Sequence, residues 1–432
     1  MTDAMTDLVS DVVSDPVAPS RQNGAPPREA GRGGVLGVGL RDRRLRGLRR
    51  DGVVPPLDAP PTVAVVEDPD AVAALAREWA ELVAATRTSP FTGPEYALAW
   101  WRHRGRGRLH VVTVRAAGRL VALAPLHVRR IAGLDVVRWL GHGLGSISEL
   151  LVAPGAEAAA NAVWEHLAAL PRVLLDLVEY RGDGAGLLAL RRFPGLEATV
   201  TLRDVCPVIE LDGVDSAESL LRRLPKRSGL RRSVIAAERA VRADGVTFAA
   251  RTATDPEAFR AMLPDLEHVH DVAEAARPRL HHLRPPWRDF TLEVLDAWLA
   301  TGRATAHLAT LDGRPAAFAV DVVGPVATSW WLARFDPGAR RYNPGHLLMR
   351  HNIDAVIRTG QRRFDLLLGD GRHKLPWATA SYDTPTVRAA PDRLAARSAA
   401  LDAVTWAHQG AHHAAHRAVD AVRTRVRTSP SG

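Results

Sequence analysis

The stretch ATLDGRPAAFAV (Ala309–Val320) consists of an apolar run, an Asp312–Gly313 pair, and a second apolar run. Asp-Gly between two such runs is typical of a β-hairpin, because its tight turn needs positive φ at both central residues. A similar stretch, VRAAGRLVALAPL (Val114–Leu126), occurs in the first half of the chain. In both halves helices precede the hairpin, and a helix and then a strand follow it. The sequence therefore predicts a duplicated α/β unit.

Hydrophobic periodicity predicts the remaining elements. For the first unit it predicts strands at 62–66, 135–141, 147–155 and 172–180, a hairpin within 109–130, and helices at 70–85, 93–104 and 156–170. For the second unit it predicts strands at 206–211, 246–251, 362–368 and 382–390, three strands within 304–335, and helices at 226–244, 255–275, 288–301 and 345–359.

A chain of 432 residues is too long for one typical core, so we expect two domains and two tails. The predicted boundaries are a disordered basic Pro/Gly/Arg-rich tail at 1–61, domains at 62–205 and 206–395, and a C-terminal helix and tail at 396–432. The tail contains the basic segment RDRRLRGLRRDG (41–52), for which a solvated tail is favoured over contact with acidic lipid or RNA.

The composition of the chain argues against several kinds of site and of protein. The single cysteine, Cys206, excludes an intramolecular disulfide and a cysteine-based metal cage, and we expect it in the core. The acidic N-terminus does not resemble a secretory signal. The most apolar window is interrupted by Asp321 and Pro325, which favours two strands over a membrane helix. We therefore expect a soluble cytoplasmic protein.

The chain has a net charge of +9, and of its 57 basic residues only Lys226 and Lys374 are lysines. Such a surplus of arginine with abundant Ala, Gly and Pro indicates a coding bias, so single arginines carry little weight. The positive charge permits phosphate-bearing partners such as a nucleotide cofactor, RNA or a membrane surface, and does not choose among them.

A loop with the sequence FDPGARRYNPGHLL (335–348) leads into the predicted 345–359 helix. Asn343 is the expected N-cap and Pro344 the first helical residue, while Gly345 permits close approach to the backbone. Free N–H groups at a helix start bind anions, and Arg340 and Arg341 could clamp phosphates. The alternatives are a pyrophosphate site, for coenzyme A or another phosphate donor, and an ordinary capped helix.

The stretch RRFDLLLGDGRHKLPWAT (362–379) is a strand that ends in Gly-Asp-Gly. Ligands gather at the carboxyl ends of strands in α/β sheets. Asp370 or His373 could take a proton from an attacking amine, and Lys374 could bind an anion. The alternative is a turn with a solvated His-Lys pair.

Weaker candidates remain. The loop containing His142, Ser146, Ser148 and Glu149 is interpreted as a turn rather than a site. The histidines of the predicted C-terminal helix lack the acid or cysteine that would complete a metal site, so no metal is expected. The basic 226–244 helix carries no aromatic residues for stacking on RNA, which favours a solvated face. The chain has no Walker A or dinucleotide motif in the right context.

Several of these motifs together resemble a known family. SPFTGPEYALAWW (89–101), LPKRSGLRRSVIAAERAV (224–241), FDPGARRYNPGHLL (335–348) and RFDLLLGDGRHKLPWAT (363–379) are similar, in this order, to motifs of bacterial GNAT-superfamily acyltransferases of the BioF-like, cellulose-biosynthesis CelD type. The resemblance covers about residues 62–390 and implies two tandem GNAT-like mixed-sheet domains, with kinship to Fem-type aminoacyl transferases.

The resemblance also implies which residues form the site. It places the pyrophosphate of an acyl-coenzyme A at the helix start, at Asn343, Pro344, Gly345 and His346. Leu347 is a further candidate cofactor-binding residue. The resemblance places Asp370 and Lys374 near the acceptor, and it matches Lys226 to the family's basic helix. This chain departs from the family in having His373 where a tyrosine is usual.

The leading prediction is an N- or O-acyltransferase that moves an acyl group from acyl-CoA to a small-molecule or saccharide acceptor in polysaccharide or envelope biosynthesis. The alternatives are a Fem-like transferase whose donor is a charged tRNA, and a non-catalytic GNAT scaffold in envelope assembly. Otherwise nucleic acid is not an expected partner, and the sequence does not decide the oligomeric state.

Overall fold

The computed structural model describes residues 61–144, 147–225, 229–276, 282–369, 371 and 373–394. The predicted N-terminal tail up to residue 60, the predicted C-terminal helix, and Ser146, Lys226 and Asp370 lie outside the described residues.

The first unit combines helices with parts of two sheets. Its helices are α2 (Pro69–Ala74), α3 (Ala76–Thr86), α4 (Pro94–Arg104), α5 (Ala158–Ala169) and α6 (Ala185–Leu190). Its strands are β1 (Thr62–Val66), β2 (Arg108–Leu109), β3 (Val111–Ala116), β4 (Arg119–Ala124), β5 (Leu126–Ile131), β6 (Leu134–Trp139), β7 (Leu151–Val152) and β8 (Val173–Leu177). The predicted 70–85 helix is two helices, which meet at Leu75.

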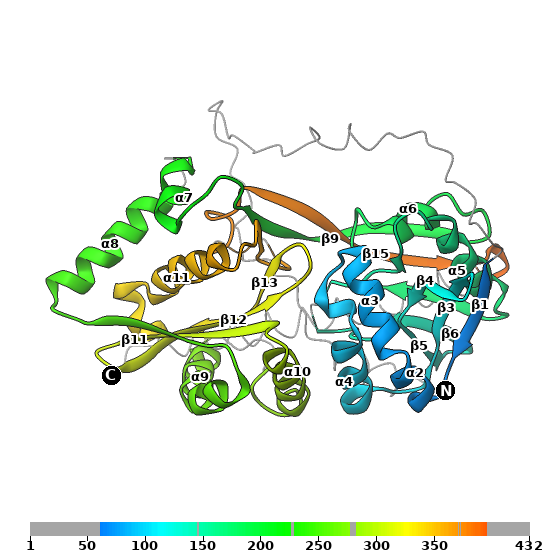
Figure 1. Ribbon diagram of the computed structural model, residues 1–432, viewed down its shortest axis with the longest axis horizontal. Helices are drawn as coiled ribbons and strands as arrows, with labels where there is room; N and C mark the ends of the chain where they lie inside the picture. Colours follow the sequence, from blue (N-terminus) through cyan, green and yellow to red (C-terminus); the bar gives the residue numbers. More distant parts are fainter. Residues whose placement is uncertain are drawn as a thin grey trace, which may run out of the picture.

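The second unit follows the same order. Its helices are α7 (Ala217–Arg223), α8 (Leu230–Ala243), α9 (Pro256–Ala276), α10 (Arg288–Ala300) and α11 (Pro344–Arg358). Its strands are β10 (Phe248–Ala253), β11 (Ala304–Leu311), β12 (Arg314–Val323), β13 (Thr328–Phe335) and β14 (Arg363–Asp365). Figure 1 shows α9 and α10 on one face of this sheet and α11 on the other.

The two predicted hairpin turns have the required backbone geometry. Asp312 and Gly313, between β11 and β12, have φ values of 49° and 76°. Ala117 and Gly118, between β3 and β4, have values of 48° and 77°. Both pairs thus form the type I′ geometry that matches the twist of the adjoining strands. The local residues determine these turns, which is why the sequence predicts them.

Two long strands connect the units: β9 (Glu197–Glu210) and β15 (Ala380–Ala390). They pair antiparallel, with Val205 opposite Asp383 near the middle of the ladder. Toward the second unit β9 pairs with β14, and toward the first unit β15 pairs with β8. Both long strands thus lie in one 11-stranded sheet, where they join the strands of the second unit to those of the first, and they extend from one half of the molecule to the other in Figure 1.

The strand order supports the expected duplication. One sheet has the order β10-β11-β12-β13-β14-β9-β15-β8-β6-β5-β2, and β1-β3-β4-β7 forms a second sheet. Each unit has a parallel pair beside the long strands, β6 with β8 in the first and β13 with β14 in the second. The predicted boundary between residues 205 and 206 falls inside β9, which begins at Glu197.

One apolar core extends across both units. At its centre the rings of Phe91 and Tyr96 from the first unit contact the rings of Phe290, Trp298 and Trp331 from the second, with centroids 5.3 to 6.3 Å apart. Aromatic pairs at these separations add to the stabilisation from burial. Within the described residues, no helix is both long and apolar enough to cross a bilayer.

Candidate active site

The sheet of the second unit opens between β13 and β14. These parallel strands pair at only two positions, Thr328 with Phe364 and Ser329 with Asp365. From Trp330 to Phe335, β13 pairs with β12 alone among the described strands. Unpaired N–H and C=O groups on a strand edge are a template for an extended ligand. This edge of β13 can therefore receive a chain that carries amide groups.

Helix α11 begins directly after β13 and the short turn that follows it. Asn343 occupies the predicted N-cap position, but its φ is 43° and its side chain does not cap the helix. The side-chain amide donates instead to Ser233 Oγ at 3.3 Å, and the Asn343 carbonyl accepts from the amides of His346 and Leu347. Pro344 has no N–H. In the described residues the Gly345 amide is thus the one left without an acceptor in this first turn.

Space is also available at Gly345. A Cβ built at this residue would come no closer than 3.8 Å to a described atom, in the ring of Phe335. The packing of the protein therefore does not itself require glycine at this position. A free amide at the positive end of a 15-residue helix is suited to an anionic group.

The two predicted phosphate-binding arginines differ in their surroundings. Arg341 forms an ion pair with Asp244, at 2.7 Å between Nε and Oδ2, and Tyr342 donates to the same carboxylate. Arg340 is exposed and has no ion pair with a described residue. Arg340 is therefore the better placed of the two to bind a ligand phosphate.

His346 is held by the loop that follows β14. The Trp377 indole donates to His346 Nδ1 at 3.1 Å, so the neutral imidazole carries its proton on Nε2. Burial lowers the pKa of His346 below its usual value. The histidine at the start of α11 therefore acts as a neutral hydrogen-bond donor at neutral pH.

Lys374 turns back onto the end of β14. Its amine donates to the carbonyls of Leu367 and Leu368. Burial lowers the pKa of Lys374 to about 8, and the nearby Cys206 and Asp204 oppose this shift. The predicted neighbour His373 is exposed, with its ring 6.0 Å from that of Trp330.

Asp365, the last residue of β14, is a functional candidate that the sequence analysis treated only as part of a strand. It is 6% exposed, accepts a hydrogen bond from the Tyr382 hydroxyl at 2.6 Å, and accepts another from the Leu367 amide at 2.8 Å. Burial raises the pKa of this carboxyl, and the Tyr382 hydrogen bond opposes the rise. A carboxylate within the apolar run FDLLL was the available signal.

The free thiol of Cys206 lies in the same cluster, on β9, and is fully buried as predicted. Burial raises its pKa well above the usual thiol value, and the charge of Asp365 adds to that shift. A thiol kept protonated in this way is a poor nucleophile. The cluster therefore offers Asp365 rather than Cys206 for proton transfer or attack.

The corresponding position in the first unit is filled by its own chain. Ser148 forms a parallel bridge to Tyr180, and its amide donates to the Glu179 carbonyl at 3.1 Å. The ring of Tyr180 packs 5.2 Å from that of Trp139 and is fully buried. Where β13 has an open edge in the second unit, the first unit thus has packed side chains.

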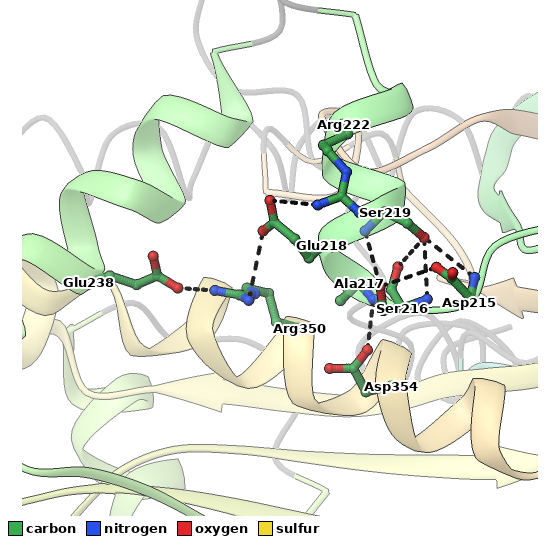
Figure 2. Close-up of polar contacts among 9 residues, drawn as sticks. All are labelled: Asp215, Ser216, Ala217, Glu218, Ser219, Arg222, Glu238, Arg350 and Asp354. Carbon is green, nitrogen blue, oxygen red and sulfur yellow. Dashed lines mark hydrogen bonds and ion pairs between the residues drawn. The ribbon is translucent and has the colours of Figure 1, made fainter.

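Helices α7 and α8 are held on α11 by charged contacts, which Figure 2 shows. Arg350 of α11 lies between Glu218 of α7 and Glu238 of α8, and the Asp354 carboxylate accepts from the Ala217 amide at 2.7 Å. The outer surface of α8 carries four exposed arginines without an ion pair to a described residue: Arg231, Arg232, Arg239 and Arg242.

Within the described residues, no three histidine, cysteine, aspartate or glutamate side chains are grouped so that they could hold a metal ion.

A family model described as "Acetyltransferase (GNAT) domain" matches residues 226–375, which include α8, α11, both strands of the open edge, and Lys374. A search of curated proteins found no match.

Solved structures with a similar fold include the crystal structure of FemX, at 12% identity and a TM-score of 0.53, covering 73% of this chain and 95% of that one. The search of solved structures also matched a domain of a putative lysylphosphatidylglycerol synthetase from Agrobacterium fabrum, at 16% identity and a TM-score of 0.47, with coverages of 77% and 96%. A tandem GNAT protein from the clavulanic acid biosynthesis pathway has 18% identity and a TM-score of 0.42, with coverages of 77% and 98%.

Residues 226–375 of the second unit therefore match a GNAT acetyltransferase domain, which supports an acyltransferase enzyme.

Proposed function

We propose that the protein transfers an acyl group from acyl-coenzyme A to an amine or hydroxyl of a small-molecule or saccharide acceptor. The observation that carries this proposal is the open edge of β13 next to the free Gly345 amide at the start of α11. The amides of the pantetheine arm would pair with the strand edge, and the pyrophosphate would bind at the helix start. Arg340 would contact a phosphate, and the neutral His346 would donate to the same region.

The reaction would follow from this placement. The acceptor attacks the thioester carbonyl, a backbone N–H at the strand opening stabilises the oxyanion, and the carbon–sulfur bond breaks to release coenzyme A as thiolate. Asp365, on the strand that lines the opening, takes the proton of the acceptor. Asp370 and His373 remain the alternative proposed proton acceptors, and Lys374 fixes the end of β14 through the Leu367 and Leu368 carbonyls.

The first experiment is calorimetric titration of the full chain with acetyl-coenzyme A and with free coenzyme A. We expect Arg340→Ala to weaken binding about tenfold, because a charge-assisted bond to phosphate is lost. The matched variant Arg341→Ala should weaken it much less, because Arg341 already pairs with Asp244. Equal effects of the two variants, or no binding by the folded wild-type protein, would contradict the proposed donor site.

A second candidate function is transfer from a charged tRNA, as in Fem-type enzymes. It is favoured by the four exposed arginines on α8 that have no carboxylate partner in the described residues. Such a surface would bind tRNA with an affinity that falls steeply with salt. Salt-sensitive tRNA binding that is lost in an Arg231→Gln/Arg232→Gln variant, together with no affinity for coenzyme A, would favour this function over the first.

A further inference from the structure

Arg181 comes from the first unit but lies against the proposed reacting centre of the second. It follows β8, where Glu179 has a φ of 54° and the chain turns toward β15. The amides of Tyr180 and Gly182 then donate to the Pro385 and Asp383 carbonyls of β15. These bonds fix the backbone on either side of Arg181 to the strand that carries Tyr382.

The guanidinium of Arg181 lies over the Tyr382 ring, 4.9 Å from its centroid. Tyr382 in turn donates to Asp365 at 2.6 Å. Only 17% of the arginine side chain is exposed, so solvent screens its charge weakly. A cation above an aromatic ring is attracted to it, and the attraction grows as water is removed. The arginine, the phenol and the carboxylate thus form one continuous contact chain.

Asp183 of the first unit holds Arg181 in this position, and the charge of Glu149 also acts on the guanidinium. Asp183 accepts from Arg181 Nε at 2.7 Å. Burial lowers the pKa of the guanidinium, and the charges of Asp183 and of Glu149, which is 5% exposed, outweigh this effect and raise it. One carboxyl oxygen of Glu149, Oε1, has no partner in the described residues.

The other groups that face Asp365 come from every neighbouring element. Tyr382 lies on β15, Cys206 on β9, Arg363 on β14, and Lys374 in the loop that follows. Each of the two arginines has a carboxylate partner: Arg363 pairs with Glu210 at 2.6 Å, and Arg181 pairs with Asp183 at 2.7 Å. The positive charge of Arg181 lowers the pKa of Asp365 and that of Tyr382.

We propose that Arg181 is a positioning residue of the reaction, through which the first unit completes the active site of the second. Held by Asp183, it fixes the Tyr382 ring and keeps Asp365 ionised as the proton acceptor. This inference rests on the proposed function, because it assigns Asp365 the role of base. It also gives the first unit, whose own strand opening is filled, a part in the chemistry.

The test is a double-mutant cycle of unfolding free energy with Arg181→Gln and Asp365→Asn, measured from pH 4 to pH 8. We expect coupling between the two positions at neutral pH that disappears as Asp365 is protonated. Arg181→Lys should keep most of the coupling, because it keeps the charge. A coupling that is absent, or that is the same at every pH, would show Arg181 to be structural only and would overturn the proposal.

Turnover provides the second readout. In Arg181→Gln the acidic limb of the pH profile of kcat/KM should move to higher pH by about 1 unit. The substitution removes a positive charge that lowers the pKa of Asp365, so the carboxyl loses its proton at a higher pH. Arg77→Gln, which removes an exposed arginine of α3, is the control and should leave the limb in place. An unchanged limb in Arg181→Gln would overturn the proposal. The cycle needs no substrate, so a failure of donor binding and a failure of this inference are distinguished.

Discussion

At the scale of single residues, Glu149 shows how burial changes the pKa of a carboxyl group. Burial raises the pKa of this carboxyl to about 7, while the charge of Arg181 opposes the rise. The folded protein therefore holds the Glu149 proton more tightly than the unfolded chain does. The stabilisation by this group is complete below pH ~4.5 and is lost as the pH rises through about 7.

We predict that Glu149→Gln removes this pH dependence. Relative to the variant, the wild-type protein should lose up to about 3 kcal/mol of unfolding free energy between pH ~4.5 and pH ~8. Denaturant unfolding at several pH values would measure the difference. Glu165→Gln, at an exposed position of α5, is the control. A wild-type-to-variant difference that does not change with pH would contradict the prediction.

The residues also show which parts of the site can be predicted from sequence. The Asp312–Gly313 turn and the Pro344 start of α11 depend on neighbouring residues, and both were predicted. Arg341 was predicted to bind phosphate, but in the structure it pairs with Asp244. The sequence does not reveal this partner, because it lies almost a hundred residues away. Asp365 and Arg181 were missed for the same reason. Their contacts exist only because β15 lies between β8 and β9.

At the scale of elements, α7 and α8 depend on α11. The Asp354 carboxylate accepts from the Ala217 amide at the start of α7, and Arg350 links both helices to α11 (Figure 2). Helix starts leave amides without intrahelical acceptors, so a carboxylate from a neighbouring helix stabilises them. The outer face of α8, which carries the four exposed arginines, therefore depends for its position on contacts with α11, the helix of the proposed donor site.

We predict that Asp354→Ala loosens α7 and α8 without unfolding the protein. The loss of one capping carboxylate should cost about 1 kcal/mol. Hydrogen exchange should then be faster in the amides of α7 and α8, and unchanged in α9 on the opposite face of the sheet. Equal acceleration in α9 would mean that the variant lowers global stability instead.

At the scale of the whole molecule, the two units repeat one architecture but differ at the strand opening. In the first unit Ser148 bridges to Tyr180, and the Tyr180 and Trp139 rings pack there. In the second unit the edge of β13 beyond Ser329 has no described strand partner. A fold can be repeated while its function is kept in one copy, because function depends on the site rather than on the fold.

We predict one acyl-coenzyme A per chain. Calorimetric titration should give a stoichiometry of one, and Gly345→Asp, which places a carboxylate at the helix start, should abolish that binding through repulsion of the phosphates. A stoichiometry of two would contradict the prediction, because it would mean that both units bind the donor. Residual binding of one equivalent in Gly345→Asp would show that the first unit also binds the donor.

The exchange of β9 and β15 between the units has a consequence for biosynthesis. Strand β8 pairs with β15, yet roughly 200 residues are translated between them. At typical elongation rates, that edge of the first unit stays uncovered for about 10 to 40 seconds after β8 has left the ribosome. The first half of this protein therefore cannot finish folding when its own residues are complete. Its nascent chain should need chaperone protection until the second half is made.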